Sequence, residues 1–371
     1  MRKVLITGAK GFIGRNIVAE LEKERDMELL KVDVDLNASE FERFLGEADF
    51  VLHLAGVNRP VDESEFVSGN AELTAWLTRM LSSRADPPPV LLTSSVQSDL
   101  DNAYGQSKRA AENAVFQYGR EQAVDVYVYK LPNMFGKWSR PNYNSVVATF
   151  CHNIARGLPI QINDPERRLT LCYIDDLLAS VRAALGGTLE PGADGYCAVE
   201  KTYETTLGEL AEQILAFRDS RQTLFMPPLK GLAKALYSTY LSCLEPDDFA
   251  YELTAHSDVR GSFYELMKTS ESGQTSVSTT APGVTRGNHW HHTKVEKFIV
   301  VSGQACIRFR KIGSSDVEEY RVSGDKPEAV DIPAGYTHSL TNTSESEVLI
   351  TLIWANELFD EKNPDTFYEE V

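Results

Sequence analysis

The stretch VLITGAKGFIG, residues 4–14, decides the fold of the first half of the chain. An apolar run ends directly in three glycines spaced three residues apart, and a segment of helical period follows them. Glycines at this spacing permit a tight turn and let the backbone approach a pyrophosphate at a helix N-terminus. The strand–turn–helix context is the support that such a motif requires. The stretch therefore predicts a dinucleotide site, formed by Gly8, Gly11, Phe12, Ile13 and Gly14.

Short apolar runs continue to alternate with helical segments up to about residue 190. This alternation predicts an α/β fold of the Rossmann type, a doubly wound parallel sheet, over residues 1–243. We expect strands at Lys3–Thr7, Leu29–Val34, Phe50–Leu54, Val90–Thr93 and Val126–Leu131. We expect helices at Ile13–Lys23, Ala71–Ser82, Gln106–Gln122, Thr206–Arg218 and Leu232–Cys243.

The pattern changes after the segment EPDDF, residues 245–249. Long helical segments disappear, and short β-rich runs alternate with Gly, Pro, Ser and Asp turns. This pattern predicts a second, all-β domain over residues 247–371, folded as a small jelly-roll barrel. The clearest strands are Phe298–Val301, Ala305–Arg310, Val330–Ile332 and Val348–Trp354.

Composition excludes several classes of protein. The net charge of −17 would repel a phosphate backbone, so we do not expect a nucleic-acid partner. Five cysteines are scattered without C-x-x-C spacing, which indicates reduced thiols. No apolar run approaches the roughly 20 residues needed to span a bilayer, and no leader precedes the first strand. We expect a cytoplasmic protein that has no membrane partner.

The motif Tyr104-Gly-Gln-Ser-Lys108 predicts a proton donor. Four-residue spacing on a helix places the phenol and the ammonium on one face. A lysine cation nearby should lower the pKa of the tyrosine and prepare it to protonate a carbonyl oxygen. The strand end Thr93-Ser94-Ser95 comes before the motif and offers a hydroxyl that could bind the same oxygen.

Five ordered motifs resemble the extended short-chain dehydrogenase/reductases that act on nucleotide sugars. They are TGAKGFIG (7–14), HLAG (53–56), TSS (93–95), YGQSK (104–108) and LPNMFG (131–136). The resemblance implies Ser95, Tyr104 and Lys108 as catalytic residues, with Ser94 as the alternative to Ser95. It also implies further cofactor contacts from Leu54, Ala55, Gly56, Asn70, Lys108 and Pro132.

The choice of cofactor depends on the end of the second strand, Val32-Asp33-Val34-Asp35. A carboxylate here, such as that of Asp33, binds the ribose hydroxyls of NAD and repels a 2′-phosphate. This pattern favours NADH, whereas the family resemblance favours NADPH, and the sequence leaves both open.

A second candidate site lies in GNHWHHTKVE, residues 287–296, and PAGYTHSLTN, residues 333–342. Imidazoles and a carboxylate that converge suit a divalent transition metal. The spacing resembles that of the cupin superfamily, which implies a metal site, expected to hold zinc. Its ligands would be His289, His291, Glu296 and His338, with His292 as the alternative to His291 if the strand is bulged.

Over its whole length the chain resembles a bifunctional bacterial family of capsule and O-antigen enzymes, through LAGVNRP (54–60), KWSRPNYNSVVATF (137–150) and GNHWHHTK (287–294). These enzymes form UDP-2-acetamido-2,6-dideoxy-L-talose, a precursor of UDP-N-acetyl-L-fucosamine, from a UDP-linked 4-keto sugar. The resemblance implies C3 epimerisation in the cupin, NAD(P)H-dependent reduction at C4 and a homodimer. It places substrate contacts at Lys137, Arg140, Asn142 and Asn144.

Two alternatives remain open at the level of sequence. In the first, the chain is a reductase whose cupin serves only as a structural dimerisation module. In the second, it is a nucleotide sensor without catalysis, although a sensor would need no proton donor such as Tyr104.

Overall fold

The computed structural model describes all 371 residues and divides into two compact units. The first unit comprises Met1–Ile214 with Gly231–Leu244, and the second comprises Leu215–Lys230 with Glu245–Val371. No helix is long and apolar enough to cross a membrane.

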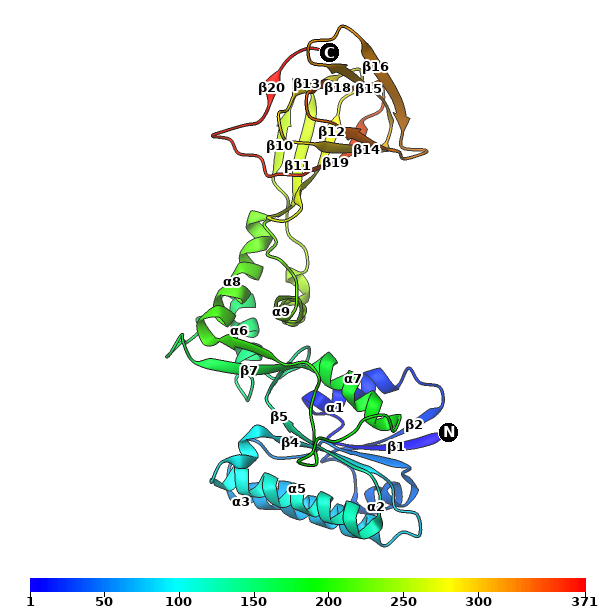
Figure 1. Cartoon of the computed structure of the whole chain (residues 1–371), viewed down its shortest axis with the longest axis vertical. Helices are drawn as coiled ribbons and strands as arrows, with labels where there is room; N and C mark the ends of the chain where they lie inside the picture. The colour runs from blue at the N-terminus through cyan, green and yellow to red at the C-terminus, as the bar shows by residue number, and fades with distance from the viewer. The chain divides into compact units, whose positions relative to one another are not determined.

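A six-stranded parallel sheet in the order β2-β1-β3-β4-β5-β8 forms the centre of the first unit (Figure 1). Its strands are continuous apolar runs, as expected for a sheet that is covered on both faces. The predicted α/β doubly wound fold is therefore confirmed. The strands are β1 (Arg2–Thr7), β2 (Met27–Val32), β3 (Phe50–His53), β4 (Val90–Ser95), β5 (Val126–Leu131) and β8 (Tyr196–Cys197).

Helices cover both faces of this sheet (Figure 1). On one face, α1 and α7 pack with Ile17, Leu21 and Leu177 against the strands. On the other face, α2, α4 and α5 contribute Leu45 and Leu77 among other buried side chains. The helices are α1 (Phe12–Leu21), α2 (Ala38–Glu47), α3 (Ser64–Phe66), the π-helical turn η1 (Val67–Glu72), α4 (Leu73–Ser82), the 3₁₀ turn η2 (Val96–Asp99), α5 (Ala103–Gln122) and α7 (Ile174–Leu185).

Helix α5 carries the Tyr-x-x-x-Lys motif, and local chemistry fixes both its ends. The side chain of Asn102 accepts a hydrogen bond from the Gly105 amide at 2.8 Å, which caps the N-terminus. Ala123 ends the helix in a left-handed conformation with φ of 54°. The remaining elements before residue 250 are β6 (Asn133–Phe135), β7 (Arg168–Tyr173), β9 (Tyr203–Thr206), α6 (Val146–Ala155), α8 (Leu207–Thr223), α9 (Leu232–Leu241) and the 3₁₀ turn η3 (Pro246–Asp248).

Apart from the end of α8 and the turn η3, the second unit is all-β, as predicted for residues 247–371. Its strands form two antiparallel sheets that enclose an apolar core. One sheet has the order β10-β11-β12-β19-β14-β17, and the other has the order β16-β15-β18-β13-β20. The first comprises β10 (Ala255–Asp258), β11 (Gly261–Thr269), β12 (Gly273–Thr280), β14 (Glu296–Ser302), β17 (Ala329–Ile332) and β19 (Leu349–Ala355). The second comprises β13 (Thr285–Trp290), β15 (Gln304–Lys311), β16 (Val317–Ser323), β18 (Tyr336–Asn342) and β20 (Phe367–Tyr368).

Candidate functional site

A cavity of about 1180 Å³ lies at the carboxyl ends of the parallel strands in the first unit. Ligands of open α/β sheets bind at this edge because the loops that follow the strands converge there. Most of the residues that the sequence selected line this cavity. They are Gly8, Gly11, Phe12, Ile13, Gly14, Asp33, Leu54, Ala55, Gly56, Ser95, Tyr104, Lys108, Pro132, Arg140 and Asn144.

The glycine loop is packed too tightly to admit side chains. Gly8 has a φ of +68°, and a Cβ atom there would lie 2.9 Å from the backbone nitrogen of Ala55. A Cβ atom at Gly14 would lie 2.1 Å from the carbonyl oxygen of Gly8. The carboxylate of Asp33 accepts a hydrogen bond from the Lys10 amide at 2.7 Å, which ties the end of β2 to this loop. The loop therefore has the close backbone packing that pyrophosphate binding uses.

Lys108 is buried, and its Nζ donates a hydrogen bond to the carbonyl oxygen of Thr93 at 3.0 Å. Burial lowers the pKa of this lysine to about 8, although the nearby Glu112 acts in the opposite direction. The cation is therefore held inside the protein, on the helix that also carries Tyr104.

Tyr104 donates a hydrogen bond from its hydroxyl to Oδ1 of Asn58 at 2.9 Å. Burial raises the pKa of this tyrosine, while the neighbouring hydroxyl of Ser95 acts to lower it. The prediction that Lys108 lowers the pKa of Tyr104 was wrong. The pKa is raised, because the loss of solvent around the phenol has the largest effect. Sequence reasoning also missed Asn58, although it lies within the motif LAGVNRP.

The two adjacent serines at the end of β4 have different surroundings. Ser94 is buried and donates a hydrogen bond to the carboxylate of Glu112, which also accepts one from the Tyr196 hydroxyl at 2.9 Å. Ser95 is half-buried, and its oxygen accepts a hydrogen bond from the Gln97 amide at 3.1 Å. Only the Ser94 hydroxyl is therefore bonded to the carboxylate of Glu112.

Three of the residues that the sequence predicted to contact cofactor or substrate do not line the cavity. Asn70 is 3% exposed. Its Oδ1 accepts a hydrogen bond from the Val57 amide at 2.9 Å, and its Nδ2 donates one to the Val57 carbonyl oxygen at 3.0 Å. Lys137 forms an ion pair with Asp175 at 3.0 Å. The backbone amide of Asn142 donates a hydrogen bond to the hydroxyl of Thr149 at 2.9 Å. Asn70 therefore shapes the loop after β3.

The second unit brings His289, His291, Glu296 and His338 together from β13, β14, β18 and the turn after β13. One ligand atom from each of the four lies within 4.8 Å of the others. Nε2 of His291 and Nε2 of His338 lie 3.5 and 3.3 Å from Oε2 of Glu296. These three buried atoms have no hydrogen-bond partner. Buried polar atoms without partners are costly, and a shared divalent cation would satisfy all of them, so the residues fit a metal.

The charge states of this cluster suit a cation. Burial alone would raise the pKa of Glu296, but contacts from His291 and His338 and the charge of Lys294 hold it well below its usual value. Burial lowers the pKa of His289 to about 4, so its ring is neutral near pH 7. A carboxylate and neutral imidazoles are the forms that bind metals.

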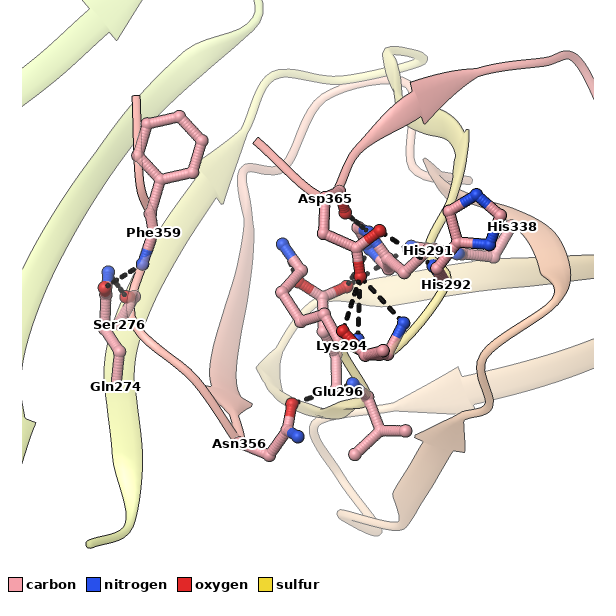
Figure 2. A network of polar contacts seen from close by, with 12 residues as sticks. Gln274, Ser276, His291, His292, Lys294, Glu296, His338, Asn356, Phe359 and Asp365 are labelled. Atoms are coloured by element: carbon pink, nitrogen blue, oxygen red, sulfur yellow. Dashed lines mark hydrogen bonds and ion pairs between the residues drawn. The ribbon is translucent and has the colours of Figure 1, made fainter. Parts of the chain in front are cut away.

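His292 lies outside this cluster. Its ring packs against Trp290 and Phe367 with centroid distances of 4.5 and 5.0 Å. A bulge does occur in β13, between Gly287 and His289. His291 is nevertheless buried and remains part of the cluster. Figure 2 shows His291, His292, Glu296 and His338 from close by.

Both parts of the chain match known families. Residues 4–191 match the NAD dependent epimerase/dehydratase family, and residues 256–367 match the polysaccharide biosynthesis C-terminal domain. The chain belongs to the NAD dependent epimerase/dehydratase family. Within this family, a reductase of Pseudomonas aeruginosa PA103 is 46% identical over 366 residues, 98% of each chain. That relative is UDP-2-acetamido-2,6-beta-L-arabino-hexul-4-ose reductase.

Several solved structures have a similar fold. The capsular polysaccharide assembling protein CapF of Staphylococcus aureus has a TM-score of 0.93 and 46% identity over 99% of this chain and 100% of that chain. UDP-glucuronic acid 4-epimerase of Bacillus cereus covers 65% of this chain and 98% of its own, with a TM-score of 0.52 and 15% identity. At that identity the likeness shows only that the two proteins share a fold.

Proposed function

We propose that the chain is a bifunctional enzyme acting on a UDP-linked 2-acetamido-2,6-dideoxy-4-keto sugar. The barrel epimerises C3, and the first unit then reduces the C4 ketone with NADH or NADPH to give UDP-2-acetamido-2,6-dideoxy-L-talose. The observation that carries the reductase assignment is that Ser95, Tyr104 and Lys108 line one cavity together with the glycine loop. The P. aeruginosa relative, a reductase of a UDP-linked 4-keto sugar by its name, supports the same substrate class.

The reductase residues divide the work of adding one hydride and one proton to a ketone. When bound, the nicotinamide cofactor supplies the hydride to C4. Tyr104 gives its phenolic proton to the ketone oxygen, and its raised pKa keeps that proton in place beforehand. Ser95 donates a hydrogen bond to the same oxygen, and the buried cation of Lys108 stabilises negative charge near it. Arg140 and Asn144, which line the cavity, would contact the sugar nucleotide.

The epimerase needs a proton α to the ketone to become acidic. A divalent metal, which we expect to be zinc, would be held by His289, His291, Glu296 and His338 and would polarise the carbonyl group. The buried carboxylate of Glu296 supplies the negative charge that attracts the cation. Reduction of the same ketone afterwards makes the new configuration at C3 permanent, which is a chemical reason for joining the two activities in one chain.

The decisive experiment incubates the purified protein with the UDP-4-keto sugar in deuterium oxide and resolves the products by NMR. Without reduced cofactor, we expect deuterium at C3 and no change at C4. With reduced cofactor, we expect the talose derivative. If C4 is reduced while C3 never exchanges, the chain is a reductase whose barrel has a structural role. Mass measurement in solution checks the expected homodimer.

A further inference from the structure

The last 16 residues, 356–371, form a C-terminal strap that returns over the metal-ligand cluster within the second unit. Its short strand β20 pairs with β13, with Tyr368 opposite His289 and Phe367 opposite Trp290. The strap is mostly exposed and contributes no residue to the apolar core of the barrel. Its position therefore needs a reason other than core packing.

Asp365 of this strap has two separate contacts with the turn that carries His291 (Figure 2). Its backbone carbonyl oxygen is bonded to Nδ1 of His291. A carbonyl can only accept, so Nδ1 carries the hydrogen and Nε2 presents its lone pair to the cluster. The strap thereby fixes both the tautomer and the orientation of one candidate ligand.

The carboxylate of Asp365 organises the chain that follows this ligand. It accepts hydrogen bonds from the backbone amides of His292, Thr293 and Lys294 at 2.8, 2.8 and 2.9 Å, and from the Thr293 hydroxyl at 3.1 Å. Charge-assisted bonds to three successive amides hold this turn in a single conformation. The turn leads directly from His291 to Glu296, so it sets the distance between two candidate ligands.

The strap also bonds a residue next to each of the other three ligands. Asn356 accepts from the amide of Val295, which precedes Glu296, at 2.9 Å. The amide of Glu369 donates to the carbonyl of Asn288, which precedes His289, at 3.0 Å. The carbonyl of Glu369 accepts from the hydroxyl of Thr337, the residue before His338. All four ligands are thus tied to the strap, directly or through an adjacent residue.

We propose that the C-terminal strap is the positioning device of the metal site, that Asp365 is its principal positioning residue, and that docking of the strap and binding of a divalent cation are coupled. The inference rests on the metal site of the proposed function. Asp365 does not touch the cation; it acts through His291 and the turn that follows. Because coupling between two binding events is reciprocal, each event must strengthen the other by the same factor.

The first test measures metal affinity in the full-length protein. Metal-free wild type, Asp365→Ala and Asp365→Asn are titrated with zinc against a chromophoric chelator, and the cobalt(II) complexes are compared by their visible absorption spectra. Asp365→Ala keeps the carbonyl that orients His291 but removes the carboxylate that holds the turn from His291 to Glu296. We expect it to weaken zinc binding by about 10- to 100-fold, the range seen when the support of a metal ligand is lost, and to change the cobalt spectrum. Asp365→Asn keeps one acceptor oxygen and should lose less.

The matched control is Asp360→Asn. Asp360 lies in the same strap, and its carboxylate accepts only from Lys362 and Asn363, inside the strap. Its replacement should leave zinc affinity within about twofold of wild type, a range that affinity comparisons resolve easily. If folded Asp365→Ala binds zinc as tightly as wild type, or if Asp360→Asn loses as much affinity, the proposal is overturned.

The second test uses the wild-type protein and does not depend on how a variant folds. Amide hydrogen exchange of residues 356–371 is measured with and without zinc. We expect zinc to slow exchange in the strap, because the ordered ligands hold its partners in place, and unchanged exchange would overturn the coupling. A protein that shows this coupling but never exchanges deuterium at C3 would refute the epimerase and leave the role of the strap intact.

Discussion

Ser94 donates a hydrogen bond to the buried carboxylate of Glu112, whereas the next residue, Ser95, is half-buried and accepts one from the Gln97 amide at 3.1 Å. Successive residues of a strand face opposite sides, so only one of two adjacent hydroxyls can face a ligand while the other contacts the core. The structure therefore gives the two serines different predicted roles.

Ser95→Ala should lower kcat for C4 reduction on the order of 100-fold, because it removes a hydrogen bond to the oxygen on which charge develops. Its melting temperature should stay near that of wild type. Ser94→Ala should show the reverse pattern. It leaves the Glu112 carboxylate with an unmade bond in the core, at a cost of about 1–3 kcal/mol in the free energy of unfolding. If Ser94→Ala has the larger kinetic effect, the assignment of Ser95 is wrong.

The buried lysine predicts a pH dependence of reduction. Burial lowers the pKa of Lys108 from 10.5 to about 8, so the cation is present below pH 8 and is lost above it. We therefore expect kcat/KM for the reduced cofactor, which reports the free enzyme, to fall as pH rises through about 8. The unfolded chain keeps this proton up to about pH 10.5, so burial of the cation costs stability below pH 8, and the cost shrinks from pH 8 to 10.5. A profile that stays flat to pH 10 would contradict this explanation.

The position of Asp33 predicts the cofactor preference. Its carboxylate lines the cavity, and it accepts hydrogen bonds from the amides of Lys10 and Val34 at 2.7 and 2.9 Å. A carboxylate held here binds ribose hydroxyls and repels a 2′-phosphate, so kcat/KM with NADH should be at least as high as with NADPH. Asp33→Asn should shift the ratio toward NADPH by roughly 10-fold, since one repulsive charge is removed. If Asp35→Asn shifts the ratio and Asp33→Asn does not, the neighbouring carboxylate is responsible.

The fold was largely predictable because its signals are local. Apolar runs of four to six residues located the strands β1 to β5, and Val126–Leu131 was placed without error. The expected end of the second strand at Val34 was two residues late, because β2 ends at Val32 and the chain turns at Asp33. Apolar content does not reveal where a strand stops pairing; the backbone hydrogen bonds decide that.

The metal-ligand cluster was partly predictable for the same reason. Three of its four residues lie within eight positions, and His338 lies opposite His289 in the pairing of β13 with β18. The choice between His291 and His292 depends on the path of a turn, which spacing does not specify. The role of Asp365 had no signal at all in the sequence. An aspartate 74 residues beyond His291 gains its function only through the folded path of the chain.

The two candidate sites lie in different compact units, so their losses should separate chemically. His338→Ala, or removal of metal by a chelator, should abolish deuterium exchange at C3, because the cluster loses a ligand or its cation. The same protein should still reduce a substrate whose C3 already has the product configuration. Tyr104→Phe should behave in the opposite way: it should exchange at C3 at the wild-type rate while C4 reduction falls by about 10²- to 10⁴-fold, the usual range for a lost proton donor.

A control is needed because metal binding contributes to folding, and His338→Ala could lose exchange simply through an unfolded barrel. Circular dichroism and solution mass must therefore match wild type before the kinetics are compared. His256→Ala is the matched variant, since His256 is an exposed histidine on β10, in the same unit but outside the cluster. It should retain both C3 exchange and zinc affinity. If folded His338→Ala exchanges deuterium at the wild-type rate, the metal does not catalyse epimerisation, and a different group in the barrel must polarise the ketone.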